Sequence, residues 1–349
     1  MKKFLLYIFL FVLPFIVIFL PYVITDPFQV LYHYDDYYID NGKGYYINTN
    51  RSFVSTQMYR QNKDHYKYDS FIFGSSRSGY FMVEDWKQYL QDSASCFHFD
   101  GYGESLYNTH KKLKFIDGKS PIRNAMFCVE RDFFWQDKQN YGHLWVLPPC
   151  LVENNFGTFH IAFIRAYLNP KFLHAYIDFL ITGKLKSYMF ENSIFEAPHS
   201  GYKLQYNECN GANRNIQKFS DEFYGERLSS FPLRPDSITY GFSVIKEAQK
   251  KMLYEIHDIL VRNNTNYKVI LNPIYDQLLF STEDKEFLLT LFGNNNIVDF
   301  SGKNRITNDY HYYSDPAHFN EYIASELMRI SYECDSIKQQ HMLDSLYNY

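Results

Sequence analysis

Two short stretches, far apart in the chain, carry residue types that could cleave or transfer an acyl group. A Gly-Ser-Ser-Arg-Ser sequence occupies residues 74–78, and an Asp-Pro-Ala-His sequence occupies residues 315–318. A serine hydroxyl becomes a nucleophile when a histidine removes its proton, and the histidine does this best when a carboxylate orients it. Ser76, His318 and Asp315 are therefore candidates for a catalytic triad.

The C-terminal stretch could instead be a metal site, with His311, Asp315 and His318 as ligands on one face of a helix. Pro316 disfavours helical backbone at Asp315, and no further ligand cluster is evident in the sequence. We therefore expect no metal and no other cofactor, and chemistry carried by side chains alone.

Short apolar runs predict the scaffold that would position these residues. Runs of this kind are typical of strands buried on both faces of a parallel sheet. A helix predicted over residues 242–262 places Met252, Ile256 and Ile259 on one stripe. We expect an α/β protein with a three-layer α/β/α sandwich and a parallel five-stranded sheet. The five expected strands are residues 70–73, 96–99, 124–129, 268–271 and 296–300.

The third and fourth expected strands are too far apart for one crossover, so residues 135–240 are predicted to be a large insertion between them. It contains two apolar segments, residues 159–168 and 172–181, each interrupted by charged or histidine residues such as Arg165 and Asp178. These interruptions disfavour a membrane span. We expect an amphipathic hairpin that either covers the active site or rests on a membrane surface.

The N-terminus predicts a single-pass membrane anchor. Lys2 and Lys3 precede an apolar stretch with no charged residue before Asp26, long enough to cross the hydrocarbon layer. The alternative is a cleaved signal peptide, but no Ala-x-Ala site follows. We expect residues 1–25 to be a signal anchor in the cytoplasmic membrane and residues 26–67 to be juxtamembrane. Residues 68–349 would form the catalytic domain on the extracytoplasmic side.

The amino-acid composition limits the classes of binding partner that are expected. The net charge of −4 without a basic stripe indicates no nucleic-acid partner, whereas the 33 tyrosines would suit contacts with sugars as well as core packing. Five widely spaced cysteines form no Cys-x-x-Cys pair. Cys96 and Cys128 are expected in the core, and Cys150 could pair with Cys209 in an exported protein.

The Gly-Ser-Ser sequence after a strand and the C-terminal Asp-x-x-His sequence resemble the SGNH/GDSL hydrolase superfamily. The Gly-Ser-Ser-Arg-Ser form resembles a membrane-anchored branch that is similar to accessory proteins of polysaccharide O-acetylation. The resemblance implies that Ser76 is the nucleophile, with Ser75 in place of the family's aspartate, and that Asp315 and His318 complete the triad. It extends over roughly residues 68–134 and 264–330.

The resemblance also implies an oxyanion hole, which is only partly matched. Backbone N–H groups of Ser76 and Gly103 would hold the oxyanion, with Gly101 as the alternative to Gly103. The family's third block contributes an asparagine, but this chain has Asp132 at the approximate place. A carboxylate there would repel an oxyanion unless it is protonated.

Two residues are candidates for substrate binding. Arg77 could bind an anionic group or form a salt bridge, and Tyr312 could stack on a sugar ring or pack against other aromatic residues. His98, inside an apolar run, is expected to be a hydrogen-bonded core residue.

These observations favour a serine-dependent esterase or O-acyltransferase acting on acyl esters, with acetyl as the expected acyl group, of a cell-surface polysaccharide. An acylated glycan and a membrane-bound O-acyltransferase are the expected partners. One alternative is a non-catalytic accessory protein of the same fold that binds a glycan or a membrane acyltransferase. A lipase acting at the bilayer is a third hypothesis.

Overall fold

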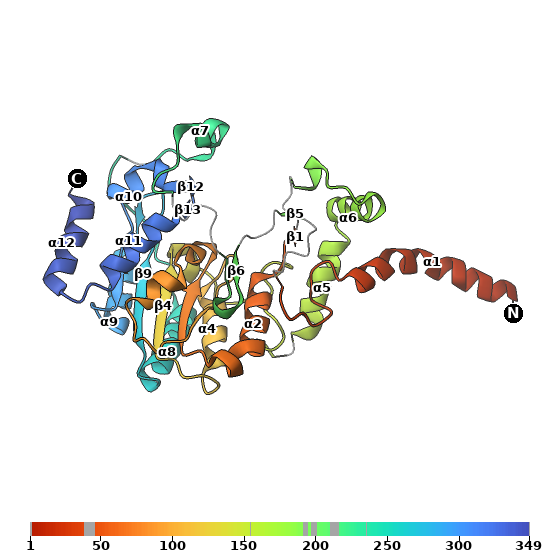
Figure 1. Cartoon of the computed structure of the whole chain (residues 1–349), viewed down its shortest axis with the longest axis horizontal. Helices are drawn as coiled ribbons and strands as arrows, with labels where there is room; N and C mark the ends of the chain where they lie inside the picture. The colour runs from red at the N-terminus through yellow and green to blue at the C-terminus, as the bar shows by residue number, and fades with distance from the viewer. Residues whose placement is uncertain are drawn as a thin grey trace.

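A five-stranded parallel sheet lies at the centre of the chain, with the strand order β11-β9-β4-β2-β3 (Figure 1). The computed structural model describes residues 2–37, 46–153, 155–190, 195–196, 201–209, 216–234 and 236–348. The sheet confirms the predicted parallel arrangement, and each strand overlaps one of the five predicted runs. The strands are β2 (Ser70–Gly74), β3 (Cys96–His98), β4 (Asn124–Val129), β9 (Asn266–Leu271) and β11 (Ile297–Asp299).

Helices cover both faces of this sheet, which explains why its strands are apolar at nearly every position. Phe71 and Phe73 of β2 belong to one hydrophobic cluster, and Ile72 between them belongs to the other. The first cluster is closed by α2 (Arg51–Tyr66), α4 (Leu106–Ile116), α8 (Glu247–Arg262) and α9 (Thr282–Phe292). The second is closed by α3 (Val83–Lys87), α10 (Arg305–Asn308), α11 (Glu321–Ser331) and α12 (Ser336–Tyr347).

Helix α8 matches the predicted helix, although it begins at Glu247 and not at residue 242. Its buried side chains include Met252, Ile256 and Ile259, so the apolar stripe faces the sheet as expected. Since α8 leads directly into β9, it is the helix through which the chain re-enters the sheet.

Helix α2 was not predicted, since its residues belong to the stretch 26–67 that was expected to be juxtamembrane. Val54 and Tyr59 are fully buried in the cluster against the sheet, so α2 is part of the globular unit. The helix was missed because polar residues also lie on its buried surface. Among them, the Arg51 guanidinium donates to the Asp100 carboxylate at 2.8 Å, and the Thr56 hydroxyl donates to a backbone carbonyl of the same helix.

In its described residues, the chain between β4 and α8 contains the two longer helices α5 and α6 and several short elements, among them the one-turn helix α7. Helices α5 (Phe156–Tyr167) and α6 (Pro170–Thr182) form the predicted hairpin, and Asn169 caps α6 through a hydrogen bond to the backbone N–H of Lys171. The short elements of this segment are η2 (Arg131–Phe134), η3 (Ser187–Met189), β5 (Phe195–Glu196), β6 (Tyr202–Lys203), η4 (Leu204–Tyr206), β7 (Glu208–Cys209), α7 (Asp221–Tyr224), η5 (Gly225–Ser230) and β8 (Thr239–Tyr240). Pairing joins β5 to β1 (Tyr46–Ile47) and β8 to β10 (Leu278–Leu279). Cys150 is a free thiol, and the side chain of Cys209 lies outside the described part of the chain.

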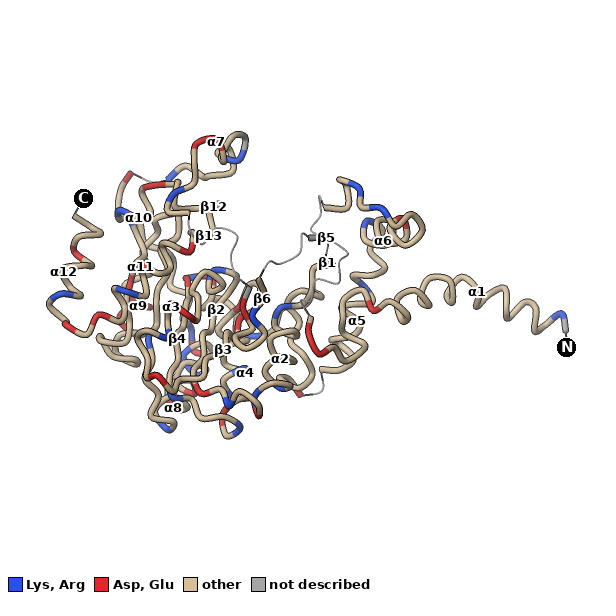
Figure 2. Tube along the Cα trace, viewed as in Figure 1, with Lys and Arg blue, Asp and Glu red and all other residues tan. Residues whose placement is uncertain are grey.

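Helix α1 (Lys2–Thr25) is long and apolar enough to cross a membrane. Figure 2 shows that its only charged positions lie at the N-terminal end. Asp26 directly follows the helix and is 2% exposed. Its carboxylate accepts hydrogen bonds from the backbone N–H groups of Val30, Leu31 and Tyr32 at 2.8–3.1 Å. The chain is therefore fixed by a tight turn where it leaves α1.

Candidate active site

Strand β2 ends at Gly74, two residues before the candidate nucleophile Ser76. Ser75 caps the short helix η1 (Ser76–Tyr80), so Ser76 lies at the carboxyl edge of the parallel sheet, where ligands bind in open α/β folds. Gly74 lets the end of β2 lie close to β4, because a Cβ atom at this position would lie 2.5 Å from the carbonyl oxygen of Cys128 on β4. The predicted strand-to-helix turn is thus present.

The structure brings Ser76, His318 and Asp315 together in the order of a catalytic triad. The Ser76 Oγ lies 2.8 Å from Nε2 of His318, and Nδ1 of His318 lies 2.9 Å from both carboxylate oxygens of Asp315. With the proton of the ring on Nδ1, Nε2 can accept the hydroxyl proton of Ser76. The His318 side chain is 25% exposed, so a substrate can reach it.

A tight hairpin holds the acid and the base of this arrangement. Asp315 ends β12 (Tyr313–Asp315) and His318 begins β13 (His318–Phe319), with Pro316 and Ala317 in the turn. Burial of Asp315 disfavours its charged form, but the hydrogen bonds from His318 and from the backbone N–H of Ala317 outweigh this and lower its pKa. Asp315 is therefore a carboxylate at neutral pH and can orient the imidazole.

Arg77 joins the nucleophile turn to this hairpin. Its Nε donates to the carbonyl oxygen of Ala317 at 2.7 Å, and its guanidinium also forms a short ion pair with Glu130, which directly follows β4. The Glu130 carboxylate accepts a second hydrogen bond from the Ser75 hydroxyl at 2.9 Å. We refer to Arg77, Glu130 and Ser75 as the arginine clamp.

A second group of hydrogen-bonded side chains, Ser78, His98 and Glu208, lies on the buried side of the nucleophile turn. The Ser78 hydroxyl donates to the Ser75 carbonyl at 2.7 Å and lies 3.0 Å from Nε2 of His98. Nδ1 of His98 lies 3.5 Å from the Glu208 carboxylate. All of these side chains are buried, so the set is closed to substrate, and the predicted core role of His98 is confirmed.

Gly103 is better suited than Gly101 to donate to an oxyanion. The backbone N–H of Gly101 is already committed to the Gly74 carbonyl at 3.2 Å, whereas Gly103 is exposed in the loop before α4. Gly103 has a φ of +53°, and a Cβ atom there would lie 3.2 Å from the indole nitrogen of Trp145. Trp145, which is 40% exposed, was not anticipated as a neighbour of this loop.

The other predicted site residues are placed less favourably for binding a substrate. Tyr312 is 6% exposed and has the Lys218 ammonium over its ring at 5.0 Å, so it packs in the core and offers no face to a sugar. Arg77 is occupied by the clamp. Asp132 is exposed in η2, and the buried carboxylate next to the nucleophile turn is Glu130. Glu130 could have been anticipated, since it is the first residue after a buried strand.

His311, which was considered as a metal ligand, forms hydrogen bonds with two carboxylates outside the triad. Its Nδ1 lies 2.6 Å from Asp309 and its Nε2 lies 2.8 Å from Asp221 of α7. Across the described residues, no group of three or more His, Cys, Asp or Glu side chains is arranged to hold a metal ion.

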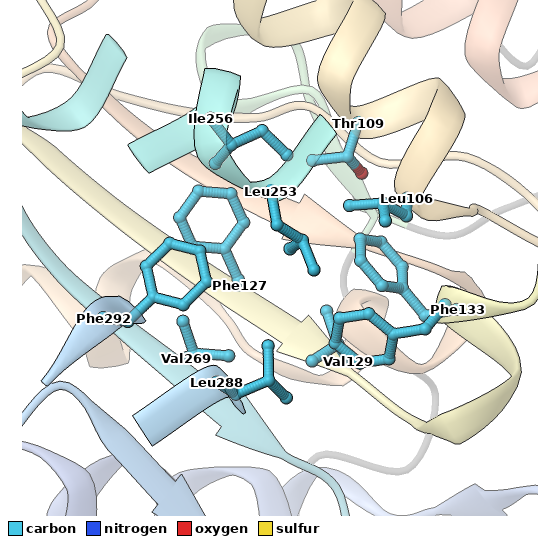
Figure 3. A pocket seen from close by; sticks show the side chains of 11 residues that line it. Leu106, Thr109, Phe127, Val129, Phe133, Leu253, Ile256, Val269, Leu288 and Phe292 are labelled. Atoms are coloured by element: carbon cyan, nitrogen blue, oxygen red, sulfur yellow. The ribbon is translucent and has the colours of Figure 1, made fainter. Parts of the chain in front are cut away.

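An apolar void near the carboxyl ends of β4 and β9 is not a substrate pocket. Figure 3 shows Phe127, Phe133, Leu253 and other apolar side chains around it. Its volume of about 20 Å³ would hold roughly one water molecule. It is a packing gap between the sheet and the α4–α8 layer.

Comparison with known proteins identifies no family: no family model matches the chain, and no curated protein matches it either.

Proposed function

We propose that this protein is a membrane-anchored serine esterase or O-acyltransferase of the SGNH-like type. The observation that carries the proposal is the continuous hydrogen-bonded series from Ser76 through His318 to Asp315 at the carboxyl edge of the sheet. The residue order and the two sequence blocks that resemble the SGNH superfamily support the same assignment.

The geometry suits a double displacement. His318 Nε2 takes the proton from the Ser76 hydroxyl as the oxygen attacks the ester carbonyl, and Asp315 stabilises the imidazolium. The backbone N–H groups of Ser76 and Gly103 are the proposed donors to the oxyanion. The bond to the alcohol then breaks, His318 returns its proton to the alcohol, and an acyl group remains on Ser76.

The second half of the reaction decides between the two activities. Water, or a sugar hydroxyl, gives its proton to His318 and attacks the acyl carbon; the bond to the Ser76 oxygen then breaks, and His318 returns the proton to that oxygen. Water as the acceptor makes the protein an esterase, and a sugar hydroxyl makes it an O-acyltransferase. We propose a cell-surface glycan as the acceptor, because α1 would hold the domain at a membrane and the tyrosine-rich chain suits contacts with sugars.

Covalent labelling with a fluorophosphonate probe tests the proposal. The full-length protein in detergent should label at Ser76, and Ser76→Ala should remove the labelling. Ser93→Ala is the matched control, because Ser93 is exposed in the turn before β3, at the opposite edge of the sheet. A folded protein that does not label, or that labels equally after Ser76→Ala, would contradict catalysis and favour the non-catalytic alternative.

A further inference from the structure

The α5–α6 hairpin carries uncovered apolar side chains next to the helix that could span a membrane. Ile161 lies on α5, Leu168 is the residue that follows its last turn, and Ile177, Leu180 and Ile181 form a stripe on α6. All five side chains are exposed, and Ile181 is 79% exposed. We refer to these five residues as the hairpin surface. A row of this kind in a water-facing position would be costly, because apolar surface is left in contact with water.

The hairpin packs directly on the C-terminal part of α1. The Tyr167 hydroxyl donates to the carbonyl oxygen of Ile18 at 2.8 Å, and the rings of Tyr167 and Tyr22 lie 4.9 Å apart. The Tyr176 hydroxyl donates to Thr25 Oγ1 at 2.6 Å. Figure 1 shows α5 and α6 beside α1, well separated from β12 and β13. The hairpin therefore neighbours the anchor and does not cover the triad.

The length of exposed helix places this contact in the outer part of the hydrocarbon layer, next to the lipid headgroups. Residues 4–17 of α1 are all exposed, and these 14 residues span about 21 Å at ~1.5 Å per residue. A hydrocarbon layer is about 30 Å thick, which leaves about 9 Å, or roughly six residues, to be covered. The next six residues are 18–23, which include Ile18 and Tyr22, the two residues that Tyr167 contacts.

We propose that the α5–α6 hairpin is a second membrane contact, which lies in the bilayer interface with the hairpin surface among the lipid acyl chains. An amphipathic helix binds a bilayer in this way, with its apolar face inserted to the boundary of headgroups and acyl chains. Tyr22, Tyr167 and Tyr176 would lie at the interface, where tyrosine is enriched. Exposed Arg165 can extend its charged end to the headgroups.

This inference rests on the proposed insertion of α1, so the experiment measures the two contacts separately. Full-length protein carrying Cys150→Ser, Cys209→Ser and Cys334→Ser would serve as the parent. Single cysteines introduced by Ile181→Cys on the hairpin surface and Val12→Cys in α1 would carry an environment-sensitive fluorophore. Val261→Cys on α8 is the matched control, because Val261 is an exposed aliphatic residue (61%) away from α1.

The labelled proteins would be placed in nanodiscs with or without a lipid that carries a nitroxide quencher on carbon 5 of its acyl chain. We expect quenching of at least about twofold at positions 12 and 181, where the label would lie among acyl chains, and almost none at position 261. Quenching at position 12 with none at position 181 would overturn the hairpin contact and leave the anchor intact. Absence of quenching at position 12 would overturn the membrane anchor and, with it, this inference.

Discussion

Replacing Arg77 with methionine removes the cation that lies between the nucleophile turn and the Asp315–His318 hairpin. Methionine keeps most of the aliphatic stem of the arginine but none of its hydrogen-bond donors. The Glu130 side chain is 5% exposed. Without Arg77 it keeps the Ser75 hydroxyl at 2.9 Å and the long contact from the Asn272 amide at 3.4 Å, but no ion-pair partner among the described residues.

The cost of Arg77→Met should therefore be that of a buried, uncompensated carboxylate, about 3–5 kcal/mol in the free energy of unfolding. Glu130→Gln should cost less, about 1–2 kcal/mol, because a neutral amide oxygen can still accept from Ser75 and Arg77. The double variant Arg77→Met/Glu130→Gln should be more stable than Arg77→Met alone, since no charge is left buried.

Urea unfolding of the full-length proteins in detergent, followed by circular dichroism, measures these differences. Lys250→Met is the matched control, because Lys250 pairs with Glu247, which is 92% exposed, and loss of that pair should cost less than about 1 kcal/mol. If the double variant were as unstable as Arg77→Met, the buried charge would not be the source of the cost. Both Arg77→Met and the double variant should label with the fluorophosphonate probe more slowly than the unaltered protein. The double variant should stay slow even where its stability recovers, because the hydrogen bond from Arg77 to the Ala317 carbonyl is missing in both.

Two further predictions concern histidines. Burial lowers the pKa of His143 to about 4, so the unfolded state binds more protons than the folded state between pH 6.5 and 4. Acidification across that window should lower the free energy of unfolding by up to about 3 kcal/mol. His143→Gln should flatten this part of the curve of unfolding free energy against pH. Asp315→Asn should slow labelling of Ser76 by about 10³–10⁴-fold at pH 7, because an amide can stabilise the wrong tautomer of His318 and cannot balance its charge. An unchanged labelling rate in folded Asp315→Asn protein would contradict the role of Asp315.

The parallel sheet was predictable because its strands are buried on both faces and so appear as continuous apolar runs, as in residues 70–73 and 124–129. Helix α2 was not predictable, because its buried surface includes Arg51 and Thr56, whose polar groups are satisfied by hydrogen bonds within the fold. Hydrophobic periodicity does not detect a helix of this kind.

The arrangement of Ser76, Asp315 and His318 could be anticipated from residue types and their local context. The surrounding groups could not, because they depend on long-range contacts. Glu208, which neighbours His98, comes from a segment without apolar periodicity, and nothing local distinguishes it from other surface carboxylates. Tyr312 was considered as a stacking residue, but tertiary packing places it in the core.

The Asp26 turn limits what a protein anchored in this way could reach. Flexible linkers let a domain sample a radius that grows with linker length. Here the carboxylate of Asp26 binds three successive backbone N–H groups directly after α1, and Tyr167 and Tyr176 brace the same helix. With α1 in a bilayer, the connection between helix and domain would be rigid, and Ser76 would lie at a fixed distance from the membrane surface. Substrates would then be selected by how far they extend from the membrane as well as by their chemistry.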